Sequence, residues 1–165
     1  MNGWNEDKGW SDAFLPEIKQ ILGVYLIGEP NAEEDQLRNT DLIVLTMKPV
    51  RIACRIRRQE YFERYQNEFT IRCTRPSENK TELSKIIEGW GEYFFYGFGN
   101  EETRKLIKWT LADLKVFRLC FMRRLYGGYK NEEKPNKDGS SNFMYFSWCD
   151  FPSEFIVASG NGRKA

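Results

Sequence analysis

Val50-Arg-Ile-Ala-Cys-Arg-Ile-Arg-Arg58 decides the fold class, because apolar and basic residues alternate along it. In a β-strand successive side chains point to opposite faces of the sheet. One face would carry Val50, Ile52, Cys54 and Ile56, and the other Arg51, Ala53, Arg55 and Arg57. The stretch therefore predicts a strand over 50–58 that bears an arginine stripe, defined as Arg51, Arg55 and Arg57.

Two further strands are predicted on either side of this stretch. Asp41 to Met47 is apolar and β-branched, and Lys48-Pro49 turns the chain after it. Glu68 to Thr74 alternates in the same manner, with Thr70, Arg72 and Thr74 on one face. The two short connections favour an antiparallel meander of three strands.

Helical patterns lie before and after the meander. Apolar residues recur with a period of 3.6 over 10–25. Asn79 and Glu82 have the spacing of a capping box, and an apolar stripe follows at Leu83, Ile86, Ile87, Trp90 and Phe94. A fourth strand is predicted over 107–111, a helix over 115–126, a mobile polar loop over 127–141, late strands over 143–148 and 155–158, and a frayed tail over 159–165.

This order of elements predicts an α/β (α+β) protein. We expect a central mixed sheet that contains the three-stranded antiparallel meander and is flanked by helices. We expect a single domain over 1–165, with its core over 10–126, the mobile loop over 127–141 and two late strands within 143–158.

Composition excludes several classes of site. The 165 residues include no histidine, which removes imidazole-based nucleophile systems and His-ligated zinc. Cys54, Cys73, Cys120 and Cys149 form no Cys-x-x-Cys pair. The polar, acidic first residues do not resemble a signal peptide, and the apolar runs are too short for a bilayer. We therefore expect a cytoplasmic protein with reduced thiols and no membrane contact.

Charge is distributed unevenly along the chain. Up to Asp41 there are three bases and nine acids, whereas Lys48 to Arg75 holds eight bases, seven of them arginine, and three acids. Arginine is suited to bidentate contacts with phosphate, so the arginine stripe together with Arg72 predicts a nucleic-acid-binding surface. An equally simple interpretation is that the basic segment pairs with the acidic one, or forms a solvated sheet face.

A meander followed by a crossover helix and another strand resembles the restriction-endonuclease-like core of the PD-(D/E)XK nucleases, over about 10–114. The best residue match is Asp41 at the start of its apolar strand, where that family places a metal-binding acid. This sequence departs from the family's second motif, which consists of a carboxylate and a lysine. Cys54 or Arg55 stands at the acid position, and Ile56 or Arg57 at the lysine position.

A rescue pattern of that family moves the second acid to the following helix, where Glu82 and Lys85 are available. The resemblance thus implies a DNA- or RNA-cleaving enzyme in which Asp41 and Glu82 hold Mg²⁺ and Lys85 stabilises developing charge. Each residue also has a structural interpretation: Asp41 as a turn cap, Glu82 as the capping-box acid, and Lys85 as its partner on the helix.

Two alternatives in which the protein catalyses no reaction stay open. The first is a nucleic-acid-binding module on the same scaffold. The second is a small protein-interaction module, for instance an inhibitor encoded by a virus or mobile element, whose arginine-rich strand face and aromatic residues form interface hot spots. The paired acidic and basic segments are also compatible with a homodimer.

Overall fold

The computed structural model describes residues 9–28, 43–44, 50–76, 80–128 and 132–162. The chain falls into two compact units, Met1–Pro49 and Val50–Ala165, and each is described by itself. The expectation of one domain over 1–165 stays a prediction. Within the described residues, no helix is both long enough and apolar enough to cross a bilayer.

The first unit contains the predicted N-terminal helix. A helical turn at 9–12 precedes α2, which spans Leu15–Leu26. The rings of Trp10 and Phe14 meet edge to face, with centroids 4.9 Å apart. A short antiparallel pair follows, formed by β1 (Ile27–Gly28) and β2 (Ile43–Val44). Only β2 represents the strand predicted over 41–47, and Asp41 lies outside the described residues.

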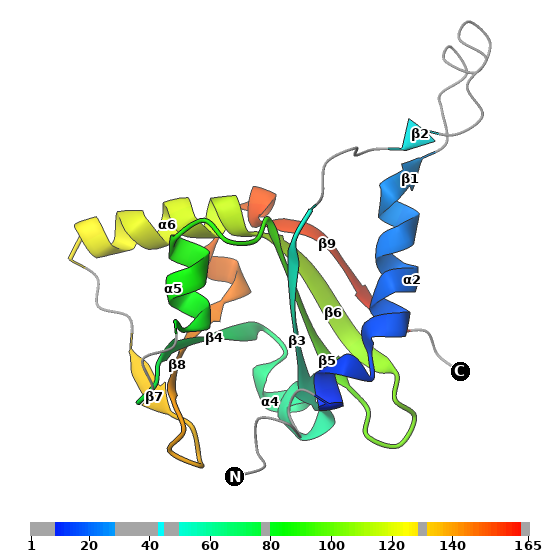
Figure 1. The fold of residues 1–165 in the computed structure, drawn as a ribbon, viewed down its shortest axis with the longest axis horizontal. Helices are drawn as coiled ribbons and strands as arrows, with labels where there is room; N and C mark the ends of the chain where they lie inside the picture. Colours follow the sequence, from blue (N-terminus) through cyan, green and yellow to red (C-terminus); the bar gives the residue numbers. More distant parts are fainter. Residues whose placement is uncertain (1–8, 29–42, 45–49, 77–79, 129–131, 163–165) are drawn as a thin grey trace, which may run out of the picture. The chain divides into compact units, whose positions relative to one another are not determined.

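The second unit is built around a mixed four-stranded sheet (Figure 1). Its strand order is β3-β5-β6-β9, and β3 runs parallel to β5 while the other neighbours are antiparallel. The strands are β3 (Ile52–Arg58), β5 (Tyr93–Gly99), β6 (Leu106–Asp113) and β9 (Ile156–Asn161). The strands predicted near 50–58 and 107–111 are therefore confirmed, and β9 continues into the region predicted as a frayed tail.

A second, three-stranded antiparallel sheet has the order β4-β8-β7. It consists of β4 (Glu68–Thr74), β8 (Asn142–Ser147) and β7 (Glu133–Pro135). The predicted three-stranded meander is wrong, because β3 and β4 belong to different sheets. The chain between them forms η1 (Gln59–Tyr61) and α4 (Phe62–Tyr65), and these helical turns carry it away from the edge of β3 instead of folding it back as a hairpin.

The helix predicted from Glu82 is shorter than its apolar pattern suggests. α5 spans Glu82–Ile87, and Phe94 lies on β5. Gly89 and Gly91 have φ values of +91° and +84°, a conformation that favours glycine and ends the helix. The N-cap is Thr81, whose hydroxyl accepts a hydrogen bond from the Ser84 amide, while Asn79 lies outside the described residues.

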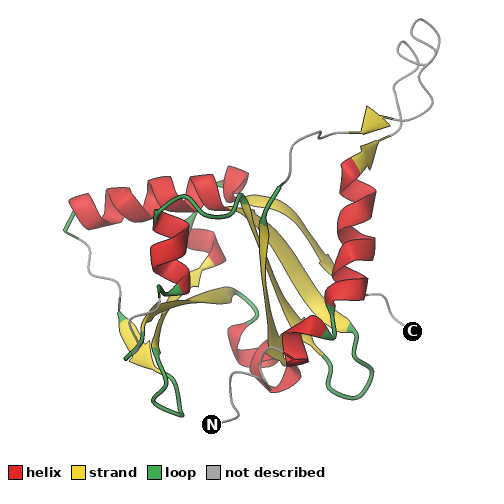
Figure 2. Ribbon diagram, viewed as in Figure 1, coloured by secondary structure: helices red, strands yellow, loops and turns green. Residues whose placement is uncertain are grey.

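The core of the second unit lies between the two sheets and two helices (Figure 2). α6 (Leu114–Tyr126) was predicted over 115–126 and contributes Phe117 and Phe121. Short turns η2 (Trp148–Asp150) and η3 (Ser153–Phe155) lead into β9. The protein is thus mixed α+β with helices flanking its sheets, as predicted, and the likeness to the restriction-endonuclease-like fold stays a prediction.

Candidate functional site

Arg55 and Arg57 of the arginine stripe lie on the core side of their sheet. In the parallel register Arg55 is opposite Tyr96 and Arg57 is opposite Phe98, two residues of the aromatic core. Ala53, on the same face, packs against that core. β3 is an edge strand, so its long arginine side chains extend along the border of the core rather than across an open sheet face.

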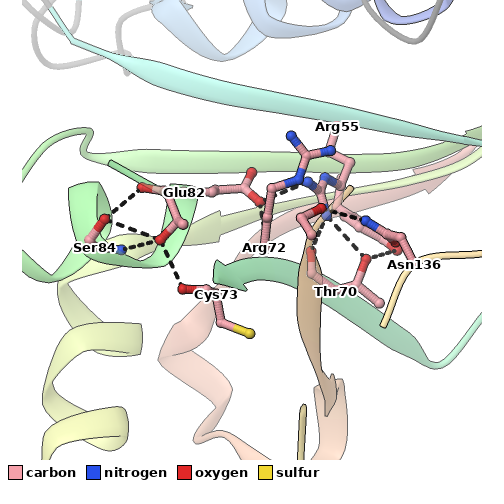
Figure 3. A network of polar contacts seen from close by, with 10 residues as sticks. Arg55, Thr70, Arg72, Cys73, Glu82, Ser84 and Asn136 are labelled. Carbon is pink, nitrogen blue, oxygen red and sulfur yellow. Dashed lines mark hydrogen bonds and ion pairs between the residues drawn. The ribbon is translucent and has the colours of Figure 1, made fainter. Parts of the chain in front are cut away.

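Arg55 is engaged by the protein's own groups (Figure 3). Its Nη2 lies 2.9 Å from Glu82 Oε2, and its Nη1 donates to the carbonyl and the hydroxyl of Thr70 at 3.1 and 3.3 Å. The Arg55 and Glu82 side chains are 24% and 22% exposed. This ion pair joins β3 and β4 to the start of α5, so Arg55 does not offer a free guanidinium to a phosphate.

The metal-binding prediction for Glu82 does not fit these contacts. Glu82 Oε2 also accepts the backbone N–H of Arg72 at 3.1 Å, so the same oxygen carries two donors. Lys85 is exposed on α5 and forms no ion pair within the described ranges. Among the residues described here, no three His, Cys, Asp or Glu side chains gather as a metal site would require. Glu82 is therefore a structural ion-pair partner in this arrangement.

The two other arginines predicted to bind nucleic acid have different surroundings. Arg51 precedes β3, and its backbone N–H donates to Glu92 Oε2 at 2.6 Å. Its side chain is 67% exposed, and its Nη1 lies 3.9 Å from Oε1 of the same carboxylate. Arg72 lies on β4, and its Nε is buried without a hydrogen-bond partner in the described part of the chain. Hydrogen bonds from Ser140 lower the pKa of Asp138, and the charge of Arg72 lowers it further.

Arg57 belongs to a group of cations and tyrosines that we call the Arg57 cluster, defined as Arg57, Tyr61, Arg64, Tyr65 and Lys137. The Arg57 guanidinium lies 4.2 Å from the Tyr61 ring centroid and 5.3 Å from that of Tyr65. Arg64 lies 5.3 Å from the Tyr65 centroid, and Lys137 Nζ 6.0 Å from the Tyr61 centroid. The two rings are 6.3 Å apart and tilted by 40°.

Four elements bring this cluster together. Arg57 comes from β3, Tyr61 from η1, Arg64 and Tyr65 from α4, and Lys137 from the connection between β7 and β8. None of its three cations takes part in an ion pair in the part of the structure that is described. Sequence reasoning found Arg57 and missed the other four, although the four-residue spacing of Tyr61 and Tyr65 is a signal for helical neighbours.

Cys54 and Cys73 offer no activated nucleophile near neutral pH. All four cysteines are free thiols. Burial raises the pKa of Cys54 to about 11. Burial, followed by the Glu133 carboxylate, raises the pKa of Cys73 to about 11. Thiols with such pKa values stay protonated where a thiolate would be needed for attack.

Comparisons with protein-family models, with curated proteins and with solved structures found no match.

Proposed function

We propose that the chain binds nucleic acid through the Arg57 cluster. The observation that carries the proposal is a group of three cations over two tyrosine rings, with no carboxylate paired to those cations within the described ranges. Guanidinium groups donate to phosphate oxygens, and tyrosine rings provide faces on which unpaired bases stack. The arrangement is suited to single-stranded nucleic acid.

The charge of the second unit supports this proposal. Val50–Ala165 contains 21 basic and 15 acidic side chains, a net charge of +6, whereas Met1–Pro49 has 4 basic and 9 acidic side chains. A basic unit attracts a polyanion over a distance and releases counterions when it binds. Of the predicted contacts, Arg57 keeps this role, and Arg55 is assigned to the ion pair with Glu82.

Titration of a labelled oligothymidylate by fluorescence anisotropy at several salt concentrations tests this function. We expect Arg57→Gln and Arg64→Gln each to weaken binding and to reduce the slope of log affinity against log salt by about 1. Tyr61→Leu should weaken binding by about 1–3 kcal/mol through lost stacking. The matched control is Lys105→Gln, an exposed base that is not part of the cluster.

A salt-independent affinity, or equal effects of Arg57→Gln and Lys105→Gln, contradicts the proposal. Mg²⁺-dependent hydrolysis, predicted from the family resemblance, is tested in the same samples. Cleavage that requires Mg²⁺ and disappears in Glu82→Gln, with the circular dichroism spectrum retained, would restore Glu82 to a catalytic role.

A further inference from the structure

α6 carries an unusual concentration of positive charge. Its sequence contains four bases and no acid: Lys115, Arg118, Arg123 and Arg124. Of these, only Arg124 forms an ion pair in the described part of the chain, 3.5 Å from Asp150. Lys115 and Arg123 are exposed and lack a carboxylate partner within those residues, so their charge is available to an external group. Arg118 also lacks one, but its guanidinium donates to backbone carbonyls.

The outer face of α6 combines these bases with exposed apolar residues. The helix buries Leu114, Phe117 and Phe121 against the core. Residues three or four apart are neighbours on a helix surface, which places Lys115, Leu119, Arg123 and Tyr126 on one outward face. Leu119 is 55% exposed and Tyr126 is 86% exposed. Large apolar side chains that water surrounds in this way commonly mark interaction sites.

Trp90 is also 61% exposed. It lies in the turn after α5, and Arg118 Nη1 donates to the carbonyls of Ile86 and Gly91 on either side of it, at 3.4 and 3.2 Å. α5 lies beside α6 (Figure 1). The turn that presents Trp90 is therefore fixed to the helix that presents the bases. We call this set the α6 surface, defined as Trp90, Lys115, Arg118, Leu119, Arg123 and Tyr126.

We propose that the α6 surface docks an acidic amphipathic helix of a partner protein. Its bases match carboxylates, and its Trp, Tyr and Arg residues are the types that dominate binding energy at protein interfaces. An apolar helix face would also remove Leu119 and Tyr126 from water, whereas a phosphate backbone would leave Leu119 exposed. This inference is independent of nucleic-acid binding at the Arg57 cluster.

A designed peptide of about 18 residues, or five helical turns, serves as the probe, with leucines on one face and glutamates on the other. A peptide of the same composition with its pattern scrambled is the control ligand. Anisotropy of the labelled peptide reports binding. The part of the tryptophan fluorescence change that is lost in Trp90→Phe reports the site, because the chain has four other tryptophans. The Trp90→Phe variant identifies its contribution.

We expect the patterned peptide to bind at least about tenfold more tightly than the scrambled one. Leu119→Ser and Arg123→Gln should each weaken it by about fivefold or more, while Lys105→Gln and Arg57→Gln leave it unchanged. Both α6 substitutions are at exposed positions, so circular dichroism should show an unchanged fold. Oligothymidylate should not displace the peptide.

Equal binding of both peptides would overturn the proposal, since charge alone would then explain the affinity. So would oligothymidylate displacing the peptide together with no effect of Leu119→Ser, which would assign the surface to nucleic acid. Self-association that Leu119→Ser abolishes would assign it to a second copy of the chain. If only the oligothymidylate assay of the Arg57 cluster fails, the peptide-binding result at the α6 surface is unaffected.

Discussion

Arg55 and Arg57 lie two positions apart on one strand and have different chemical surroundings. Arg55 meets a carboxylate and a threonine in a half-buried cluster, whereas Arg57 lies over tyrosine rings. Alternation predicts that both point to the same face, which the register confirms. It does not tell which neighbours that face meets, because Glu82 and Tyr61 come from other elements.

The first prediction concerns the Arg55–Glu82 pair. Arg55→Met and Glu82→Leu should each lower the free energy of unfolding by about 1–3 kcal/mol, because each leaves a partly buried charge without its partner. The double variant should lose less than the sum of the two. Urea denaturation provides the measurement, and additive losses would show that the pair contributes no coupling energy.

The raised pKa of Cys54 predicts that the stability of the protein depends on pH. The pKa of this thiol is about 11 in the folded protein, compared with an ordinary value of 9.0. Between these values the unfolded chain releases the thiol proton and the folded chain retains it, so the free energy of unfolding falls as pH rises. We expect the stability advantage of wild type over Cys54→Ala to shrink by about 1–2 kcal/mol between pH 9 and 11. A constant difference in urea titrations would contradict this.

The boundary between α5 and β5 shows how elements compete for the same residues. The helical period continues in the sequence to Phe94, yet Tyr93–Gly99 is a strand. Alternate residues Phe94, Tyr96 and Phe98 face the core, and Phe95 on the other face stacks on Trp109 with centroids 5.5 Å apart. A strand buries this run of aromatic residues on two faces, whereas a helix would leave part of it in water.

Gly91 should therefore be a sensitive position. Its φ is +84°, and a Cβ there would lie 3.2 Å from Leu114 Cδ1. We expect Gly91→Ala to lower the free energy of unfolding by about 1–3 kcal/mol, from strain and crowding together. Gly89→Ala, with φ of +91° and open space, should cost less.

The matched control is Gly23→Ala in α2. A Cβ at Gly23 meets nothing within 4 Å, so the substitution should be neutral or stabilising by up to about 1 kcal/mol. If Gly91→Ala behaves like Gly23→Ala in urea denaturation, the turn does not require glycine.

The two sheets of the second unit share one aromatic core, and Phe69 of β4 is central to it. The centroid of its ring lies within 6.3 Å of ring centroids from both sheets, from α6 and from the late turns. These rings belong to Phe94, Tyr96, Phe117, Phe146, Trp148, Phe151 and Phe155. Residues far apart in the chain thus meet at one side chain, so the stability of this unit depends on all of these elements together.

Phe69→Ala should lower the free energy of unfolding by about 3–5 kcal/mol, because it leaves a cavity among buried rings. Leu119→Ala, on the exposed face of α6, should change it by less than about 0.5 kcal/mol. Thermal and urea denaturation compare the two variants. A small effect at Phe69 would mean that the surrounding rings collapse into the space.

The local alternation and periodicity of the sequence were sufficient to predict α2, β3, β4, β6, α6 and β8, because each pattern lies within a single element. They also predicted a mixed α+β protein without the comparison of any relative. Tertiary structure decided which strands pair, and it placed β3 beside β5 instead of β4. It also paired Glu82 with Arg55 in an ion pair, and it brought Tyr61, Tyr65 and Lys137 into one cluster with Arg57. The pairing of Arg55 with Thr70 joins residues 15 apart, and that of Tyr61 with Lys137 joins residues 76 apart. Local pattern contains no information about which distant groups meet.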